Sequence, residues 1–189
     1  MKVELVDHTA NPVQKIGRFA GICYDAKTDA ESNIKRAAHC VNSGHLSTLR
    51  FAYATLYVQM SRVCLAQFTR SKHLDYLVRS SRYCEESEAE FYAPESIVSS
   101  GFGYQYNDHI NAARKLYSEL REAGIAKQDA RFILPQSQMT ELYVTGNFQA
   151  WRDFIKLRTT KAAQGEIREI ANEIKTQLTA IAPEIFGDL

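Results

Sequence analysis

The chain has 189 residues, a formal net charge of +1 at pH 7 and hydrophobic side chains at 45% of its positions. This length suits a single domain over residues 1–189 with a sizeable core, and the near-neutral charge argues against nucleic acid as a partner, because non-specific binding to it needs a broad positive field. No apolar run approaches the roughly 20 residues that span a bilayer, and the N-terminus lacks the apolar segment of a signal peptide, so we expect a soluble, cytoplasmic protein without membrane contact.

The N-terminal quarter is predicted to contain one strand and two helices. Residues 1–7 alternate apolar and charged side chains, which predicts a short strand. Asn11-Pro12 suits a helix start, with asparagine as the cap and proline in the first turn. A second helix is expected over 29–42, and Gly44 is placed to end it in a left-handed conformation.

The clearest strand pattern covers residues 50–59, where large and small apolar side chains alternate and both faces are expected to be covered. Ser61 can cap a short helix that leads into a basic stretch at 67–83. The acidic segment that follows is predicted to be a loop, with Pro94 as a stop.

The C-terminal half is predicted to be mainly helical. The expected elements are a Ser/Gly-rich link at 99–104, helices at 108–124, 128–133, 147–157 and 165–181, and a strand or helix edge at 138–145. The four cysteines show neither CxxC pairing nor zinc spacing. We therefore expect reduced, mostly buried thiols and no metal site.

The stretch 67–83 concentrates positive charge. Its basic side chains fall within thirteen residues: Arg70, Lys72, His73, Arg79 and Arg82. Asp75 is the only acid among them. A chain with so small a net charge has no global need for such a cluster, so a bound anion is the simplest explanation, and a solvated basic helix face is the alternative.

The segment from Ala130 to Glu166 carries a series of short motifs. In order they are Ala130-Arg131 with Leu134-Pro135, Thr140-Glu141, Asn147 with Asp153, Leu157-Arg158, and Ala163-Gln164 with Glu166-Ile167. Their order and spacing resemble those of the flavin-dependent thymidylate synthases, over about thirty-five residues.

The basic stretch then aligns with that family's signature, RHRxxSxNxxSxR. Three residues match it, Arg70, Ser80 and Arg82, and Tyr83 directly after it matches the family as well. Five depart from the family's usual residues: Ser71, Lys72, Asp75, Leu77 and Val78. Upstream, Gly44-His45 and Ser47 match a Gly-His-x-Ser/Thr motif, whereas Arg50 stands where a glutamate is usual. The chain is thus identified as a divergent member.

The resemblance implies a mixed α/β (α+β) fold in which long helices flank a sheet. It also implies methylation of dUMP to dTMP, with FAD as cofactor and with methylenetetrahydrofolate and NADPH as co-substrates. The family forms homotetramers whose active sites use several subunits, so a homotetramer is expected here.

The residues that the resemblance assigns to dUMP are Gln67, Phe68, Thr69, Arg70, Val78, Arg79, Ser80, Ser81, Arg82, Arg131 and Arg158. Arg158 is the implied catalytic residue, because an arginine can stabilise a deprotonated uracil N3–O2 edge and so make C5 more nucleophilic. Gln67 and Arg70 lie one helical turn apart and could face one ligand. Ser80 and Arg82 could do so only if the backbone between them bends. A surface ion pair with Asp153 or Glu166 is the alternative for the two C-terminal arginines.

The residues assigned to FAD are His45, Ser47, Arg70, Ser71, Lys72, Val78, Asn147, Phe148, Gln149 and Asp153. Asp153 stands where the family has a neutral amide, so it would repel a phosphate but could accept from an adenine amine or a ribose hydroxyl. Because the departures gather on the flavin side, two alternatives stay open. One is a related enzyme that transfers another group, such as hydroxymethyl, and the other is a nucleotide-binding homologue without catalysis.

Overall fold

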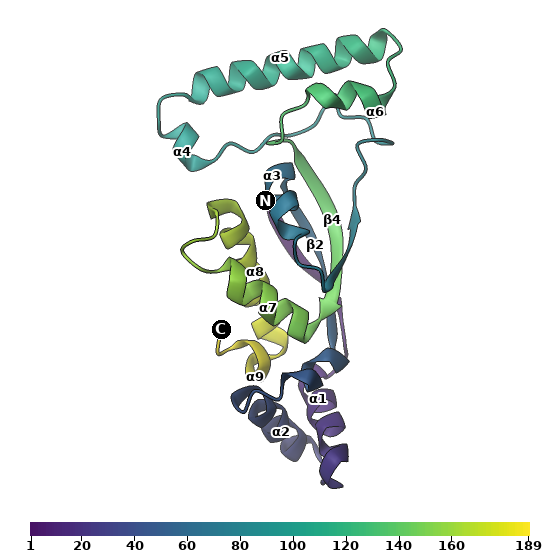
Figure 1. Ribbon diagram of the computed structural model, residues 1–189, viewed down its shortest axis with the longest axis vertical. Helices are drawn as coiled ribbons and strands as arrows, with labels where there is room; N and C mark the ends of the chain where they lie inside the picture. Colours follow the sequence, from purple (N-terminus) through teal and green to yellow (C-terminus); the bar gives the residue numbers. More distant parts are fainter. The chain divides into compact units, whose positions relative to one another are not determined.

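The framework of the structure is a four-stranded antiparallel sheet with the strand order β1-β2-β4-β3. Figure 1 labels two neighbouring strands of this sheet, β2 and β4. Its strands are β1 (Lys2–His8), β2 (Tyr53–Ser61), β3 (Leu74–Val78) and β4 (Met139–Asn147). With the helices described below, the predicted mixed α/β class is confirmed. The computed structural model describes every residue, from Met1 to Leu189.

The chain divides into two compact units, each built from segments that are distant in sequence. Unit 1 comprises Met1–Val58, Thr69–Tyr76 and Tyr143–Leu189, and unit 2 comprises Gln59–Phe68 and Leu77–Leu142. The strands β2, β3 and β4 each contribute residues to both units. The single domain expected from the sequence stays a prediction.

Unit 1 contains most of the helices and most of the core. Its helices are α1 (Pro12–Gly21), α2 (Ala30–Asn42), α7 (Phe148–Arg158), α8 (Gly165–Ile181) and α9 (Pro183–Phe186), with 3-10 turns η1 (Ile22–Tyr24) and η2 (Leu46–Phe51). α1 and α2 approach so closely that a Cβ atom at Gly17 would lie 1.8 Å from the Asn33 carbonyl oxygen. Fully buried Trp151 fastens α7 to β2, because its indole Nε1 donates to the Ala54 carbonyl at 3.0 Å.

Strand β2 is fully buried on one face and half-buried on the other. Ala54, Leu56 and Val58 are fully buried, whereas on the other face Tyr53 is 44% exposed and the residues after it are half-buried. The predicted full coverage therefore holds for one face. The strand also begins later than predicted, at Tyr53, because η2 takes up the preceding residues.

Most predicted helix boundaries are confirmed, with one different cap. Asp29 accepts a hydrogen bond from the Ser32 amide at 2.9 Å, and Gly44 has the expected positive φ of 74°. Pro12 begins α1 as predicted, but Asn11 adopts φ 49° and its side chain caps nothing. The chain thus enters α1 through a left-handed residue, which asparagine tolerates better than most.

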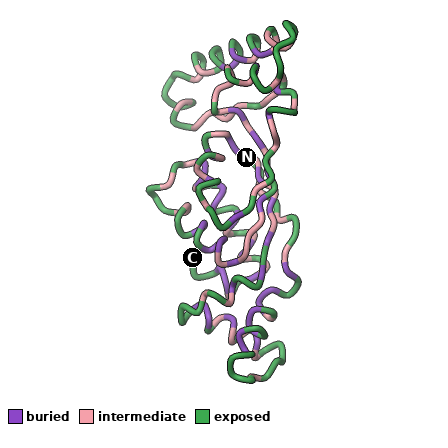
Figure 2. The backbone as a smooth tube through the Cα atoms, turned by 45° about the vertical axis from the view of Figure 1, so that its right-hand side comes forward, coloured by how far each residue is buried: buried purple, intermediate pink, exposed green.

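Unit 2 has a thinner core. Its helices are α3 (Arg62–Phe68), α4 (Glu95–Val98), α5 (Gly103–Glu122) and α6 (Lys127–Ala130), followed by the 3-10 turn η3 (Arg131–Ile133). α5 starts earlier than predicted, and only Ile110, Ala113 and Tyr117 on it are buried. Figure 2 accordingly shows most of this helix as exposed. The acidic segment is a loop, as predicted, with one bridge between Phe91 and Gln138.

The helical spacing of Gln67 and Arg70 requires α3 to continue into the basic stretch, and it does not. α3 ends at Phe68, and after a turn the chain enters β3, a strand that the sequence did not predict. The Ser71 carbonyl closes this turn, since it accepts from the Leu74 amide at 3.2 Å and from the Tyr76 hydroxyl at 2.8 Å.

All four cysteines are free. No disulfide forms, as predicted. Cys40 and Cys64 are buried, whereas Cys23 is exposed and Cys84 is partly exposed, so the predicted burial holds for two of the four thiols. None of the helices combines the length and apolar character that crossing a membrane requires.

Candidate functional site

A pocket of about 300 Å³ in unit 1 brings predicted ligand residues together. Those that line it are Arg70, Ser71, Lys72, Asp153 and Arg158. The remaining lining consists of His73, Leu74, Ala150, Phe154 and Leu157. The pocket thus combines three permanent cations and one carboxylate with an apolar wall, a composition that suits an anion bearing a flat ring.

One wall of the pocket is a face of α7. Ala150, Asp153, Phe154, Leu157 and Arg158 recur at helical spacing and all line the cavity. The helix is held at its start by Asn147, whose Oδ1 accepts from the Ala150 amide at 2.9 Å. The sequence analysis assigned only the polar members of this face, although the same periodicity identifies the apolar ones.

The cations at the mouth of the pocket are not neutralised within the chain. Arg70 and Lys72 are exposed, and neither has a hydrogen-bond or ion-pair partner. Asp153, by contrast, accepts from the Gln149 side-chain amide at 2.7 Å. This bond satisfies part of its carboxylate, and the three cations of the pocket still outnumber this one negative charge.

Tyr76 holds the turn that carries these cations. Its hydroxyl donates to the Ser71 carbonyl at 2.8 Å. Burial raises the pKa of the Tyr76 hydroxyl to about 12, against smaller opposing effects of that hydrogen bond and of the nearby Arg158 charge. The hydroxyl therefore stays protonated at neutral pH and keeps donating. No motif in the sequence points to this role of Tyr76.

The other residues assigned to FAD lie in different surroundings. His45 and Ser47 are exposed around the start of η2, and Val78 lies in unit 2 at the end of β3. The side-chain oxygen of Asn147 already accepts the hydrogen bond that caps α7. Phe148 is fully buried, with its ring 5.0 Å from that of Phe186, so its side chain is part of the core.

In unit 2, residues 79–84 form the tight loop that the sequence required for Ser80 and Arg82 to act together. The amides of Tyr83 and Cys84 both donate to the Ser80 carbonyl, at 3.1 and 2.9 Å, so the backbone bends between these residues. Arg131 Nη1 donates to the Ser81 hydroxyl at 3.0 Å. The structure therefore brings Ser81 and Arg131 together, as their common assignment to one ligand requires.

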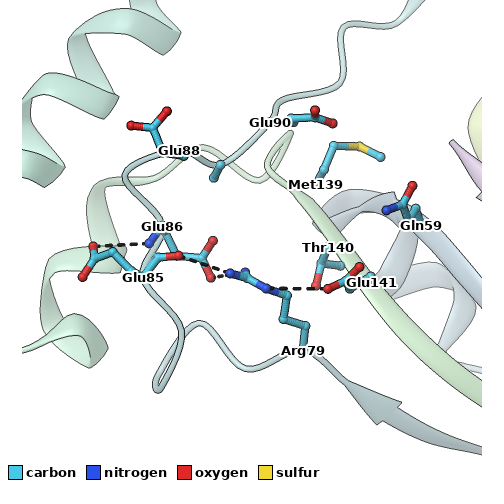
Figure 3. A pocket seen from close by; sticks show the side chains of 10 residues that line it. Gln59, Arg79, Glu85, Glu86, Glu88, Glu90, Met139, Thr140 and Glu141 are labelled. Atoms are coloured by element: carbon cyan, nitrogen blue, oxygen red, sulfur yellow. Dashed lines mark hydrogen bonds and ion pairs between the residues drawn. The ribbon is translucent and has the colours of Figure 1, made fainter.

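The other two arginines of the loop also have partners within unit 2. Arg82 Nε donates to the Gln128 side-chain oxygen at 3.0 Å. Arg79 lies 2.5 Å from Glu86 and 3.8 Å from Glu141 (Figure 3), in a pocket of about 310 Å³. Glu86 is only 2% exposed, so it holds Arg79 at the base of the loop.

The remaining dUMP residues flank the end of α3. Gln67 is half-buried and Phe68 is fully buried, both in unit 2, and Thr69 is exposed in unit 1. The side chain of Phe68 is one of the buried side chains of α3. The unit 1 pocket and the unit 2 loop thus carry the two main groups of predicted ligand residues.

Comparison with known proteins identifies the family of the chain. A family model described as "Thymidylate synthase complementing protein" matches residues 4–184. The chain is 33% identical to the flavin-dependent thymidylate synthases of Mycolicibacterium gilvum and Mycobacterium tuberculosis, over 90% of its own length and 77% of theirs. It is 32% identical to a probable flavin-dependent thymidylate synthase of Mycobacterium phage D29, over 97% of its length and 86% of the relative's. The chain therefore belongs to the flavin-dependent thymidylate synthase family of enzymes.

Proposed function

We propose that the protein methylates dUMP to dTMP, with FAD as cofactor, methylenetetrahydrofolate as the one-carbon donor and NADPH as reductant. The observation that carries this proposal is the unit 1 pocket, where Arg70 and Lys72 have no partner in the chain. Cations left without partners around an apolar wall favour a nucleotide, because its phosphates neutralise charge while its ring covers apolar surface.

The residues of this pocket fit a flavin nucleotide. Arg70 and Lys72 would meet the pyrophosphate, with Arg70 as a fork and Lys72 as a point charge. Ser71 and Asp153 would bind hydroxyl or amine groups. When bound, the cofactor would supply two kinds of chemistry, transfer of the one-carbon unit and delivery of hydride.

Arg158 is proposed to activate the substrate. Its guanidinium lies at the end of α7, in a pocket that the apolar side chains Leu74 and Phe154 also line. There it would stabilise negative charge on the N3–O2 edge of the uracil ring, so that C5 gains electron density for alkylation. Arg158 carries a permanent charge and would move no proton itself.

The loop of unit 2 is proposed to bind the nucleotide phosphate. Ser80, Ser81 and Arg82 offer hydroxyl, amide and guanidinium donors within one bend, and Arg131 adds a second guanidinium at Ser81. The remaining assigned residues are proposed to complete the sites: Gln67, Phe68, Thr69 and Val78 for dUMP, and His45, Ser47, Asn147, Phe148 and Gln149 for FAD.

A homotetramer is part of the proposal, and exposed apolar side chains support it. In unit 2 the exposed aromatic side chains are Phe132, Tyr104, Tyr83 and Phe102, which are 83%, 76%, 71% and 63% exposed. So much exposed aromatic surface is typical of a face that another chain covers.

The proposal is tested with purified protein reconstituted with FAD. Incubation with dUMP, methylenetetrahydrofolate and NADPH is expected to give dTMP, identified by its mass. A product heavier than dTMP by one oxygen would establish hydroxymethyl transfer instead. Protein that is colourless and takes up no added FAD would contradict both enzymatic functions.

A further inference from the structure

We propose that Glu86 is a positioning residue: through Arg79 it fastens the base of the loop Ser80–Cys84 and thereby sets the affinity of that loop for a nucleotide phosphate. The inference rests on the proposed function for the identity of the ligand. It also changes the role of Arg79, from a residue that touches the ligand to one that holds the loop from behind.

The first observation is how the side chain of Arg79 spans the loop. Its Nη1 contacts Glu86 Oε1 at 2.5 Å, and its Nη2 donates to the Glu85 carbonyl at 3.2 Å. Arg79 precedes the loop and the two glutamates follow it, so the guanidinium ties the two ends together (Figure 3). Its backbone amide donates to the Glu141 carbonyl at 2.9 Å, which fixes the tie to β4.

The second observation is that Glu86 is anchored independently of Arg79. Its second carboxylate oxygen accepts from the Gln138 side-chain amide at 2.8 Å, and its backbone amide donates to the Tyr117 hydroxyl at 3.2 Å. Glu86, Gln138 and Tyr117 are all nearly or fully buried. The Glu86 carboxylate is therefore held in place without Arg79, and the Arg79 side chain connects the loop to it.

This arrangement has a specific consequence for Arg79. A guanidinium engaged by a buried carboxylate and a carbonyl has fewer donors left for a phosphate. The donors of the loop itself remain, namely Ser80, Ser81 and Arg82. Fastening the base would reduce the conformational freedom that the loop loses when it binds an anion, which raises affinity without a new contact.

The test compares Glu86→Gln, Arg79→Gln and the double variant, each loaded with FAD, with dUMP affinity measured by calorimetry. Positioning predicts that each single variant weakens binding by about tenfold, the equivalent of one charge-assisted hydrogen bond. It also predicts that the double variant is no weaker than either single one, because both remove the same tie. Glu119→Gln, which breaks the exposed Lys115–Glu119 pair of α5, is the matched control and is expected to bind as the wild type does.

Direct contact of Arg79 with the phosphate predicts different dUMP affinities for the variants. If Arg79 touched the phosphate directly, Arg79→Gln would weaken binding, whereas Glu86→Gln would free the guanidinium and leave affinity unchanged or higher. That result would overturn the inference. Should Glu86→Gln fail to fold, Glu86→Asp shortens the carboxylate arm and makes the same test.

Hydrogen exchange separates this inference from the proposed function. In ligand-free Glu86→Gln, the amides of Tyr83 and Cys84, which bond to the Ser80 carbonyl, are expected to exchange about tenfold faster than in the wild type. Unchanged exchange would show that the loop does not depend on Glu86. Wild-type protein that binds no dUMP would contradict the proposed ligand, and exchange would still decide whether Glu86 holds the loop.

Discussion

Arg70 of the unit 1 pocket and Arg79 at the base of the unit 2 loop come from one basic stretch but have opposite surroundings. Arg70 has no partner in the chain, whereas Arg79 is held by Glu86 and Arg82 by Gln128. Charge density along a sequence therefore does not separate cations that await a ligand from cations that hold the fold. What separates Arg70 from Arg79 is the buried carboxylate of Glu86, which already engages the Arg79 guanidinium.

The largest effect is expected where a cation acts on the reacting ring. Arg158→Ala should reduce kcat by about a thousandfold, as removal of a preorganised electrostatic contact does, without a comparable change in unfolding temperature. Steady-state kinetics on the FAD-loaded protein measures this effect. Lys156→Ala, an exposed residue of the same helix outside the pocket, is the matched control. Comparable activity of wild type and Arg158→Ala would remove Arg158 from the mechanism.

Arg79→Ala should act on stability. It leaves Glu86, at 2% exposure, without its cation, and breaking such a pair costs about 3 kcal/mol in the free energy of unfolding. Urea denaturation measures the loss. A change below about 0.5 kcal/mol, usual for surface positions, would mean that the Glu86 contact does not stabilise the fold. Arg79 and Arg70 would then not differ in their contribution to stability.

Arg70→Ala should show the reverse pattern. Because the side chain has no partner in the chain, the free energy of unfolding should change by less than about 0.5 kcal/mol. Affinity for FAD should fall by roughly ten- to a hundredfold, the range of a charge-assisted hydrogen bond. Titration of the apo-protein, followed by flavin fluorescence, measures this. Loss of stability together with unchanged affinity would mean that Arg70 belongs with Arg79.

Local patterns predicted the helices of unit 1 well. α8 has the predicted bounds and α7 is shifted by one residue, because their apolar spacing and the Asn147 cap are contained in the local sequence. Strand β3 was missed because its existence depends on a distant partner, β4. Their contact is so close that a Cβ atom at Gly146 would lie 2.3 Å from Leu74 Cδ2.

The candidate site divides in the same way. The helical period of α7 predicts which of its residues share the pocket wall, from Ala150 to Arg158. Nothing in the sequence indicates that Glu86, among several neighbouring acids, is the buried one that engages Arg79. That pairing depends on tertiary packing against Gln138 and Tyr117, which neither spacing nor composition reveals.

The smallest effect is expected at Arg152, a cation of unit 1 that is paired with a carboxylate. Arg152 is 2% exposed and contacts the Ile185 carbonyl and the Asp188 carboxylate, the latter at 2.5 Å. Asp188→Asn keeps the shape but removes the negative charge, and Ile185 still satisfies part of the guanidinium. The free energy of unfolding at pH 7 should therefore fall by only about 1–2 kcal/mol, with FAD affinity unchanged because neither residue lines the pocket.

The pH dependence of this variant identifies the charge as the cause. The hydrogen bond from Arg152 holds the pKa of Asp188 below its ordinary value of 3.8 in the folded state. As pH falls, the unfolded chain takes up the proton first, so the stabilisation is complete above that ordinary value and is lost as pH falls through the lower folded one. Urea denaturation between pH 7 and pH 3 should show the wild type converging on Asp188→Asn. A difference that stays constant over this range would mean that packing of the last turn, rather than the Asp188 charge, stabilises Arg152.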